Sequence, residues 1–208
     1  MTDWQTLSEQ VRSRVLAENA GTAVAFAAIT AERLIRLDPR RLPFTQSLRP
    51  LLDLVWRAAA GDQTAFKPIA VAVGEFYISE YCHNDGQDGP DDADDDPAAA
   101  ILFAAECYLH AEPAFAVHVA SRAIDAVDYR MELASEDYTG DEAIDVDPDD
   151  AMEAEARQQL ADLDALASYA TKLSHARFGL PDDQRESLLA ALRDMGNVSA
   201  STPSTCEG

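Results

Sequence analysis

Apolar residues recur along most of the chain at intervals of three and four, the spacing that places them on one face of an α-helix. Leu7, Val11 and Val15, for example, form such a stripe near the N-terminus. Strict alternation of apolar and polar residues, which is typical of a half-buried strand, is weak throughout. The pattern therefore predicts an all-α fold of about eight helices in one bundle-like domain.

The predicted helices cover residues 3–18, 22–37, 45–60, 62–83, 98–110, 113–135, 147–175 and 182–195. Thr6 and Glu9 also fit a capping box, so the start of the first helix stays open within a few residues. Asp62 is expected to cap the fourth helix, and Asp147 with Pro148 to begin the seventh. The helices at 22–37 and 98–110 are apolar almost all round, which indicates burial, and Cys107 is expected to be a buried thiol.

Two acidic segments and a tail interrupt the helical pattern. Residues 84–97 and 136–148 are rich in aspartate and are expected to be loops, because their charges repel one another and little in them can be buried. The tail at 196–208, rich in Ser and Thr, is expected to be flexible. Residues 1–195 are then one domain, since 208 residues are enough for one substantial core.

Two pairs of short segments resemble each other. Residues 31–35 resemble residues 105–109, and residues 52–55 resemble residues 124–127. A duplicated helical hairpin would explain both matches, and so would chance in a chain this rich in alanine. Both explanations stay open.

The letters AERL at 31–34, followed by LLDLVW at 51–56, resemble the YjaG-like bacterial proteins. The resemblance covers roughly residues 23–132 and includes the Ala-rich helix pair at 98–132. It implies a helical fold and no particular activity, because the function of that family is unknown. The acidic insert at 85–96 and the long helix at 147–175 depart from the family's usual pattern.

The chain is strongly acidic, and its acidity is concentrated in one part. It carries 16 Lys and Arg against 38 Asp and Glu, a net charge of −22. Residues 61–150 hold three of the basic and 23 of the acidic residues, a net of −20. Such a field repels phosphate backbones and anionic membranes, so neither nucleic acid nor membrane is predicted as a partner. A basic protein is the partner that this charge fits.

The cysteines and the N-terminus favour a cytoplasmic protein. The three cysteines form no CxxC pair, which is typical of a reducing compartment rather than of a disulfide framework. The N-terminus has no basic and apolar run of the kind that makes a secretory signal. The most apolar stretches are too short or too interrupted to span a bilayer.

Signatures of enzymes and of resident metals are missing or incomplete. The chain has no Gly-x-Ser-x-Gly, no phosphate loop and no Gly-x-Gly-x-x-Gly. One Glu-x-x-His motif, at 80–83, lacks the second that a di-iron bundle needs. The aspartates at 145, 147 and 149 suit a calcium loop, but Asp150 and Ala156 replace its glycine and glutamate. Cys82, His83, Cys107 and His110 are zinc-type ligands on helix positions too far apart. No cofactor is predicted, and whether the chain is an enzyme is not decided, although a non-enzyme is favoured.

The leading hypothesis is a protein-binding module, such as an immunity protein that neutralises a nuclease toxin. Its candidate docking surface is a polar stripe on one helix together with the acidic run before residue 97. The members of this surface are His118, Arg122, Asp125, Tyr129, Asp91, Asp92, Asp94, Asp95 and Asp96. A merely solvated face is the simpler interpretation of the same stripe.

The alternative hypothesis is a metal-dependent helical-bundle enzyme that uses the carboxylates of Glu32, Asp53, Glu106 and Asp125. Glu32 and Glu106 lie in the two most apolar helices, where an unpaired carboxylate is costly, so each must face a partner, a pocket or water. Internal partners such as Arg33, Arg36 or Arg122 would explain them without a site. A homodimer built on the Ala-rich helices is compatible with either hypothesis.

Overall fold

The computed structural model describes residues 3–38, 42–79, 96–136 and 147–199, and over these ranges it contains α-helices, one 3₁₀ turn and no strand. The elements in chain order are α1 (Asp3–Ala17), α2 (Ala20–Leu37), α3 (Pro43–Ser47), α4 (Arg49–Ala59), η1 (Gln63–Ala65), α5 (Phe66–Tyr77), α6 (Asp96–His110), α7 (Pro113–Glu136), α8 (Pro148–Ala167), α9 (Ala170–Ala176) and α10 (Asp182–Ser199). The predicted all-α fold is confirmed.

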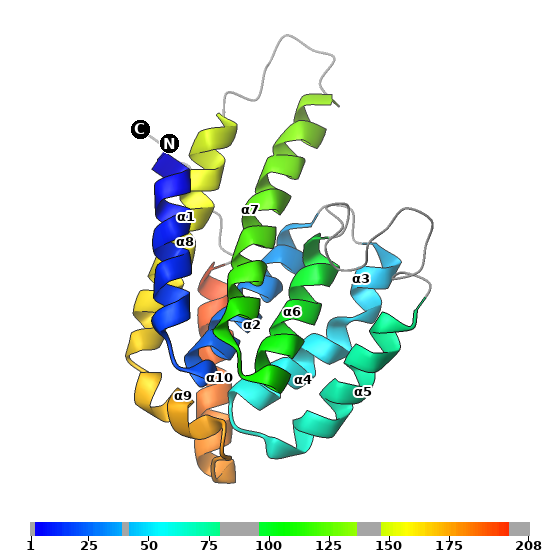
Figure 1. The fold of residues 1–208 in the computed structure, drawn as a ribbon, viewed down its shortest axis with the longest axis vertical. Coiled ribbons are helices and arrows are strands. Elements are labelled where there is room, and N and C mark those ends of the chain that lie inside the picture. The colour runs from blue at the N-terminus through cyan, green and yellow to red at the C-terminus, as the bar shows by residue number, and fades with distance from the viewer. Residues whose placement is uncertain (1–2, 39–41, 80–95, 137–146, 200–208) are drawn as a thin grey trace.

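Two Ala-rich helices, α2 and α6, form the centre of the bundle (Figure 1). Every residue of α2 from Gly21 to Ile35 is buried, as is every residue of α6 from Asp96 to Cys107. α2 contacts α4, α6, α7, α8, α9 and α10. The alanine faces of these two helices are therefore covered within the chain and offer no surface for the homodimer that the composition suggested.

The contacts that a duplicated hairpin requires are present. α2 packs against α4, α6 packs against α7, and α2 also packs against α6. These pairings are compatible with a repeat but also with an unrelated bundle. The duplication itself stays a prediction.

Three helices, α1, α7 and α8, lie side by side on one flank of the bundle (Figure 1). A small apolar cluster joins them, separate from the main core. Its buried members are Ile124, Val127, Met152 and Ala156, with Trp4, Leu7 and Ala151 packed against them. On the other flank α5 packs against α4, α6 and η1, and the ring of its Phe76 also lies near that of Phe44 on α3.

Two predicted helices are divided near prolines. The helix predicted at 45–60 is α3 and α4, separated at Leu48, because Pro50 in the first turn of α4 has no N–H to continue the preceding helix. The helix predicted at 62–83 begins as η1, with Pro68 following, and ends at Tyr77. Its last predicted turn, which includes Cys82 and His83, lies outside the described residues.

The helix predicted at 147–175 is divided without any proline or glycine, into α8 and α9. The cause is tertiary. α9 folds back over the start of α2, where a Cβ on Gly21 would lie 2.0 Å from the carbonyl oxygen of Leu173. Asn19 caps α2 by accepting from the N–H of Thr22, and its side chain also reaches the carbonyl of Ala170. A straight helix through residue 169 could not make these contacts.

Two helix ends also differ from the expectation. α6 begins at Asp96, so the last two residues of the predicted loop 84–97 are helical, with Pro97 in the first turn, where proline is well tolerated. α10 continues to Ser199, past the predicted start of the tail at Gly196. Within this helix a Cβ on Gly196 would lie 3.3 Å from the ring of Trp56, so glycine lets the helix pack closely there. Glu136 ends α7, and Asp147 and Pro148 begin α8, so the described ends of the predicted loop 136–148 belong to helices or their caps. Residues 84–95, 137–146 and 200–208 lie outside the described residues.

The two expected helix caps are confirmed. Asp147 accepts a hydrogen bond from the N–H of Asp149 at 2.9 Å, ahead of Pro148 at the start of α8. Asp62 accepts one from the N–H of Thr64 at 3.0 Å and so caps η1. Along the described part of the chain, none of the helices combines the length and the apolar character needed to cross a membrane.

Candidate functional site

A groove of about 250 Å³ runs between α1 and α7, with α8 at its floor. Trp4 and Arg14 hold α1 in place beside it. The indole Nε1 of Trp4 donates to Asp149 at 2.9 Å, and Arg14 pairs with Asp164 at 2.7 Å. The groove is lined by Trp4, Gln5, Ser8, Glu9 and Arg12 of α1, Val117, Ala120, Ser121, Ile124 and Asp125 of α7, and Gln159 of α8.

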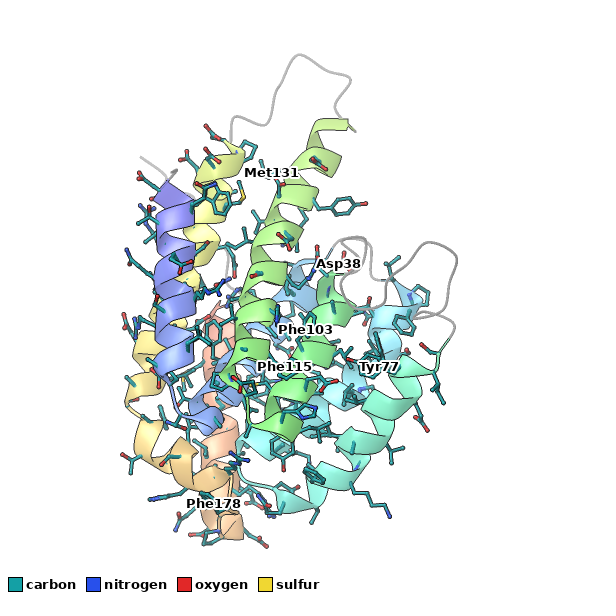
Figure 2. The ribbon with its side chains drawn as sticks, viewed as in Figure 1. Asp38, Tyr77, Phe103, Phe115, Met131 and Phe178 are labelled. Atoms are coloured by element: carbon teal, nitrogen blue, oxygen red, sulfur yellow. The ribbon has the colours of Figure 1, made fainter. Side chains whose placement is uncertain are left out.

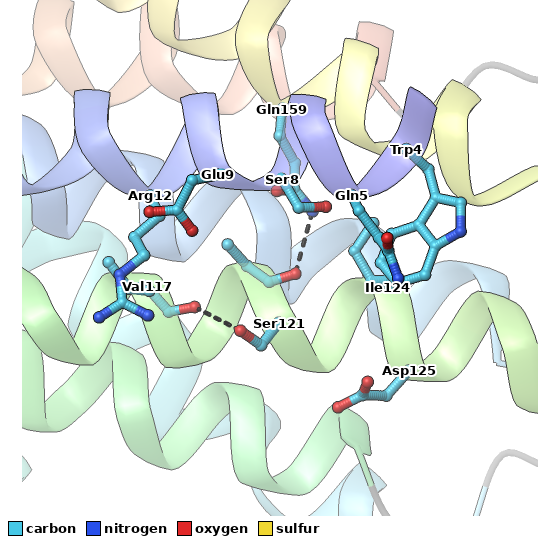
Figure 3. Close-up of a pocket in the computed structure, with 11 residues that line it drawn as sticks. Trp4, Gln5, Ser8, Glu9, Arg12, Val117, Ser121, Ile124, Asp125 and Gln159 are labelled. Atoms are coloured by element: carbon cyan, nitrogen blue, oxygen red, sulfur yellow. Dashed lines mark hydrogen bonds between the residues drawn. The ribbon is translucent and has the colours of Figure 1, made fainter. Parts of the chain in front are cut away.

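The groove differs in character from one end to the other (Figure 3). Glu9 and Arg12 lie at one end near Val117, whereas Trp4, Ile124 and Asp125 lie toward the other. The Asp125 end therefore offers an aromatic ring, an aliphatic side chain and a carboxylate. This combination suits a cationic group with an apolar stem, such as an arginine or lysine side chain.

Two polar side chains face the inside of the groove. Gln159 is buried and donates through its amide to the carbonyl of Ala120 at 3.1 Å and to Glu155 at 2.9 Å, which fixes its position. The buried hydroxyl oxygen of Ser8 has no hydrogen-bond partner among the residues that the structure describes. Leaving a buried hydroxyl unpaired costs about 1–3 kcal/mol, so a ligand that bonded to Ser8 would recover part of that cost.

Asp125 is a partly compensated charge at one end of the groove. Its side chain is 49% exposed and lies 3.6 Å from Arg122, which also pairs with Asp96 at 3.3 Å. Burial raises the pKa of the Asp125 carboxyl above its ordinary value, and neighbouring Asp128 adds to the rise while Arg122 opposes it. A positive group bound at this end of the groove would stabilise the ionised carboxylate.

The four residues of the predicted polar stripe on α7 do not share one surface: two of them contact α6, and one lines the groove. The ring of His118 is exposed but lies 5.1 Å from that of Phe103 on α6, centroid to centroid. The side chain of Arg122 is only 17% exposed and ties α7 to Asp96 on α6. Of the four stripe residues, Asp125 is the one that lines the groove. Tyr129 is half-buried further along α7. The stripe is therefore not one continuous docking face.

The predicted acidic part of the docking surface is corrected at one position. Asp96 is 1% exposed and pairs with Arg122 inside the structure, because it begins a helix rather than ending a loop. Asp91, Asp92, Asp94 and Asp95 lie outside the described residues.

Glu32 has internal partners, as the simpler interpretation expected, but they come from more than one helix. Its carboxylate accepts hydrogen bonds from Arg36 at 2.8 Å, Arg49 at 2.8 Å and the indole N–H of Trp56 at 3.2 Å. Burial alone would raise the pKa of Glu32, but the hydrogen bonds from Arg49 and Arg36 outweigh it and the pKa lies below its ordinary value. Glu32 is thus a paired structural charge.

The four carboxylates of the alternative metal site are engaged separately. Glu32 binds the arginines just described, Asp53 pairs with Arg193 at 2.7 Å, and Glu106 pairs with His110 at 2.8 Å. Asp125 lies at the groove. Among the residues with described positions, no three His, Cys, Asp or Glu side chains are grouped so that they could hold a metal ion. The hypothesis of one shared metal centre at these carboxylates is wrong for this fold.

A buried charge network that the sequence analysis missed connects α2 to α8. Arg33 binds Glu155 at two points, 2.8 and 3.1 Å, and Asp162 at 2.7 Å. Burial opposes the charge of Arg33, but the two carboxylates outweigh it and raise its pKa. Gln159 lies in the same network and on the floor of the groove. The network therefore links the floor of the groove to α2.

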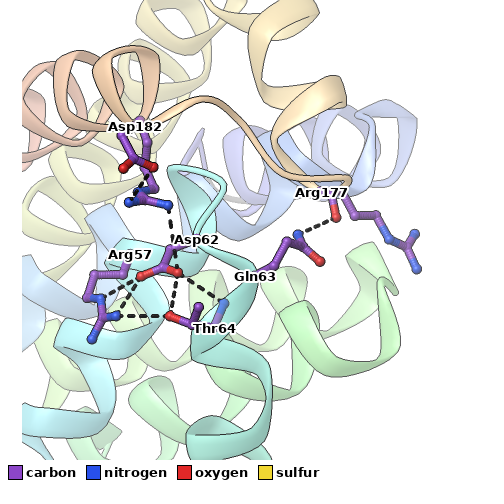
Figure 4. A network of polar contacts seen from close by, with 7 residues as sticks. Arg57, Asp62, Gln63, Thr64, Arg177 and Asp182 are labelled. Atoms are coloured by element: carbon purple, nitrogen blue, oxygen red, sulfur yellow. Dashed lines mark hydrogen bonds and ion pairs between the residues drawn. The ribbon is translucent and has the colours of Figure 1, made fainter.

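A second network joins the turn before α5 to the connection between α9 and α10 (Figure 4). Asp62 accepts hydrogen bonds from Arg57 at 2.6 and 2.9 Å and from the hydroxyl of Thr64 at 2.6 Å. Gln63 donates to the carbonyl of Arg177 at 2.7 Å. Burial would raise the pKa of Asp62, yet the bonds from Thr64 and Arg57 outweigh it and lower the pKa. All its strong contacts are internal, so this network is structural.

Sequence analysis also missed Trp4, Ser8 and Gln159 as groove residues. Trp4 stands on the apolar side of an otherwise polar first turn, a weak signal that it packs against something. Ser8 and Gln159 carry no comparable signal, because nothing local indicates that α1 and α8 meet over α7.

Comparison with known proteins adds no further residues: no protein-family model, curated protein or solved structure matches the chain. The resemblance to the YjaG-like proteins stays a prediction.

Proposed function

We propose that this chain is a binding module for a basic protein, which docks on the groove between α1 and α7 and on the acidic residues around its Asp125 end. The observation that carries the proposal is Asp125 itself. It is a half-exposed carboxylate in a groove that Trp4 also lines, and the arginine that pairs with it, Arg122, also pairs with Asp96. An arginine or lysine of a partner would supply the missing charge.

The charges around this end support the same partner. We call this set the acidic end: Asp3, Asp125, Asp128, Glu132, Asp147, Asp149 and Asp150, all of which are exposed. They belong to the start of α1, the second half of α7 and the start of α8, which lie together in Figure 1. Arg130, between two of them on α7, is directed inward and donates to the carbonyls of Ala126 and Leu37.

Grouped charges of one sign act together on a partner. Charges closer than the Debye length of about 8 Å at physiological salt reinforce one another. Complementary fields of this kind raise association rates and select partners more than they raise affinity. An immunity protein that neutralises a basic nuclease is one class of protein that uses such a surface, and a cytoplasmic location goes with that proposal.

The test compares two triple variants with the same change in net charge. One removes charge at the groove: Asp125→Asn, Asp128→Asn and Glu132→Gln. The control removes it from exposed positions of α10: Asp183→Asn, Glu186→Gln and Asp194→Asn. An oligoarginine peptide serves as the basic probe, and the fluorescence of Trp4 in the groove reports binding. Buried Trp56 adds a constant background.

We expect the wild type and the α10 variant to bind the peptide alike, with an affinity that falls as salt rises. The groove variant should lose most of this affinity. If both variants lost affinity for the peptide equally, overall charge and not the groove would explain binding. If neither variant lost affinity, the groove would not be the binding site. Basic proteins captured from a lysate by the wild type and the α10 variant, but not by the groove variant, would then identify the partner.

A further inference from the structure

The outer face of α5 carries exposed apolar side chains next to charged ones. Its inner face buries Ile69, Val73 and Phe76 against the core. On the other side Val71 is 51% exposed and Ile78 is 77% exposed. α5 lies at the edge of the bundle (Figure 1), and Figure 2 shows side chains projecting outward from it. Large exposed apolar residues grouped on one helix face indicate an interaction surface.

Gly74 is in the middle of this face. A Cβ built at Gly74 would have no atom of the described residues within 4 Å. Glycine inside a helix is unfavourable relative to alanine, so its presence is explained where another backbone approaches closely. Gly21, by contrast, lies against the backbone of Leu173, and Gly196 lies against the ring of Trp56. A helix of a second copy has room to pack closely at Gly74.

Two opposite charges on the same face could pair with the same two residues of a second copy. Lys67 and Glu75 are exposed, and neither forms an ion pair with a described residue. They are eight residues apart, about 12 Å along the helix, with Val71 midway between them. If two α5 helices packed antiparallel about a twofold axis at Val71, each Lys67 would meet the Glu75 of the other copy.

We propose that α5 is the interface of a homodimer, in which the α5 helices of two copies pack antiparallel about a twofold axis near Val71. A single pair of helices buries less than the roughly 1,600 Å² of a standard interface, so we expect a reversible dimer. A symmetric interface requires a self-complementary patch, which Lys67 and Glu75 provide. The face lies on the opposite flank from the groove, so this proposal does not depend on the proposed function.

The first test is charge reversal, read by sedimentation velocity of the full chain over a range of concentrations. The interface contains two Lys67–Glu75 pairs related by the twofold axis. Either single change, Lys67→Glu or Glu75→Lys, would turn both pairs into pairs of like charges and should shift the monomer–dimer equilibrium toward monomer by tenfold or more. The double variant, Lys67→Glu with Glu75→Lys, restores both pairs in exchanged positions and should dimerise like the wild type. Single reversals without effect, or a double variant that stays monomeric, would overturn the antiparallel arrangement.

The second test uses the space around Gly74. Gly74→Leu places its Cβ where no atom of the described residues lies within 4 Å, so the variant should fold normally, but the added side chain should block close approach and abolish the dimer. Ala190→Leu, on an exposed position of α10, is the matched control and should leave the dimer unchanged. A wild type that stays monomeric at all concentrations overturns the proposal. If Gly74→Leu then also lowered the thermal midpoint, another part of the same chain would cover this face.

Discussion

Arg33 on α2 and Glu155 on α8 form a two-point ion pair in the interior, Nε to Oε2 at 3.1 Å and the second guanidinium nitrogen to Oε1 at 2.8 Å. The third guanidinium nitrogen binds Asp162 at 2.7 Å, so one arginine holds two carboxylates of the same helix. The pairing joins helices more than a hundred residues apart in the chain. Through Gln159 it also sets the floor of the groove.

Replacing this arginine should be strongly destabilising. Arg33→Met leaves Glu155 and Asp162 buried without their cation, and breaking a buried pair in this way costs about 3–5 kcal/mol. Urea unfolding followed by circular dichroism measures the loss. Arg14→Ala, which removes an exposed pair with Asp164, is the control and should cost less than about 1 kcal/mol.

Destabilisation by the two unpaired carboxylates can be distinguished from destabilisation by lost packing of the arginine side chain. Combining Arg33→Met with Glu155→Gln and Asp162→Asn removes the stranded charges as well. The triple variant should then be more stable than Arg33→Met alone. If it is less stable, the arginine acts mainly through packing rather than by pairing the two carboxylates.

Asp125 should weaken the folded state at neutral pH. Its pKa is raised by burial, so between its unfolded and folded values the folded chain binds more protons than the unfolded chain. Its contribution to stability therefore falls as pH rises through this window. Asp125→Asn should raise the thermal midpoint at pH 7, and the difference should vanish below about pH 4. Asp183→Asn on α10 is the control, and a variant less stable than wild type at pH 7 would contradict the argument.

Two glycines should respond to alanine in opposite directions. Gly74→Ala has free space and a better helix former, so it should stabilise the chain by about 0.5–1 kcal/mol in denaturant unfolding at concentrations low enough to keep it monomeric. Gly21→Ala would place a methyl 2.0 Å from the carbonyl oxygen of Leu173 and should destabilise by more than about 1 kcal/mol. A neutral Gly21→Ala would mean that α9 is free to move away from α2.

Cys107 should be inert in the folded protein. It is fully buried, and burial raises the pKa of its thiol to about 12. At pH 8 only about one molecule in 10⁴ would carry the reactive thiolate. Iodoacetamide labelling followed by peptide mapping should leave Cys107 unmodified in the native chain and modify it fully in urea. Rapid native labelling would show that α6 opens far more often than its burial indicates.

Most of the secondary structure could be predicted from the local pattern of apolar and polar residues in the sequence. The buried faces of α2 and α6 follow from runs of apolar residues, and the caps at Asp62 and Asp147 follow from single side chains that bond two residues ahead. The breaks at Leu48 and between α8 and α9 were missed. The first depends on how Pro50 fits a particular turn, and the second on a contact with α2 that no local pattern records.

The candidate site could be predicted from the sequence only in part, because its residues come from three helices. Asp125 was identified from its position on a polar stripe, but the same stripe placed Arg122 and His118 beside it, and the fold directs both of these to α6. Glu32 was rightly expected to have internal partners, and Arg36 at i+4 could be named from spacing alone. Arg49 and Trp56 could not, since they reach Glu32 only when α4 crosses α2.

The sequence by itself determined that this is an acidic chain of amphipathic and buried helices, because helix formation and burial of one face depend on residues three and four apart. The tertiary structure alone decided which charges are paired, that α1 and α7 enclose a groove over Gln159, and that α5 keeps an apolar face outside. Those outcomes depend on which helix faces meet across long stretches of chain. That choice is made by the packing of the whole core and not by any one segment.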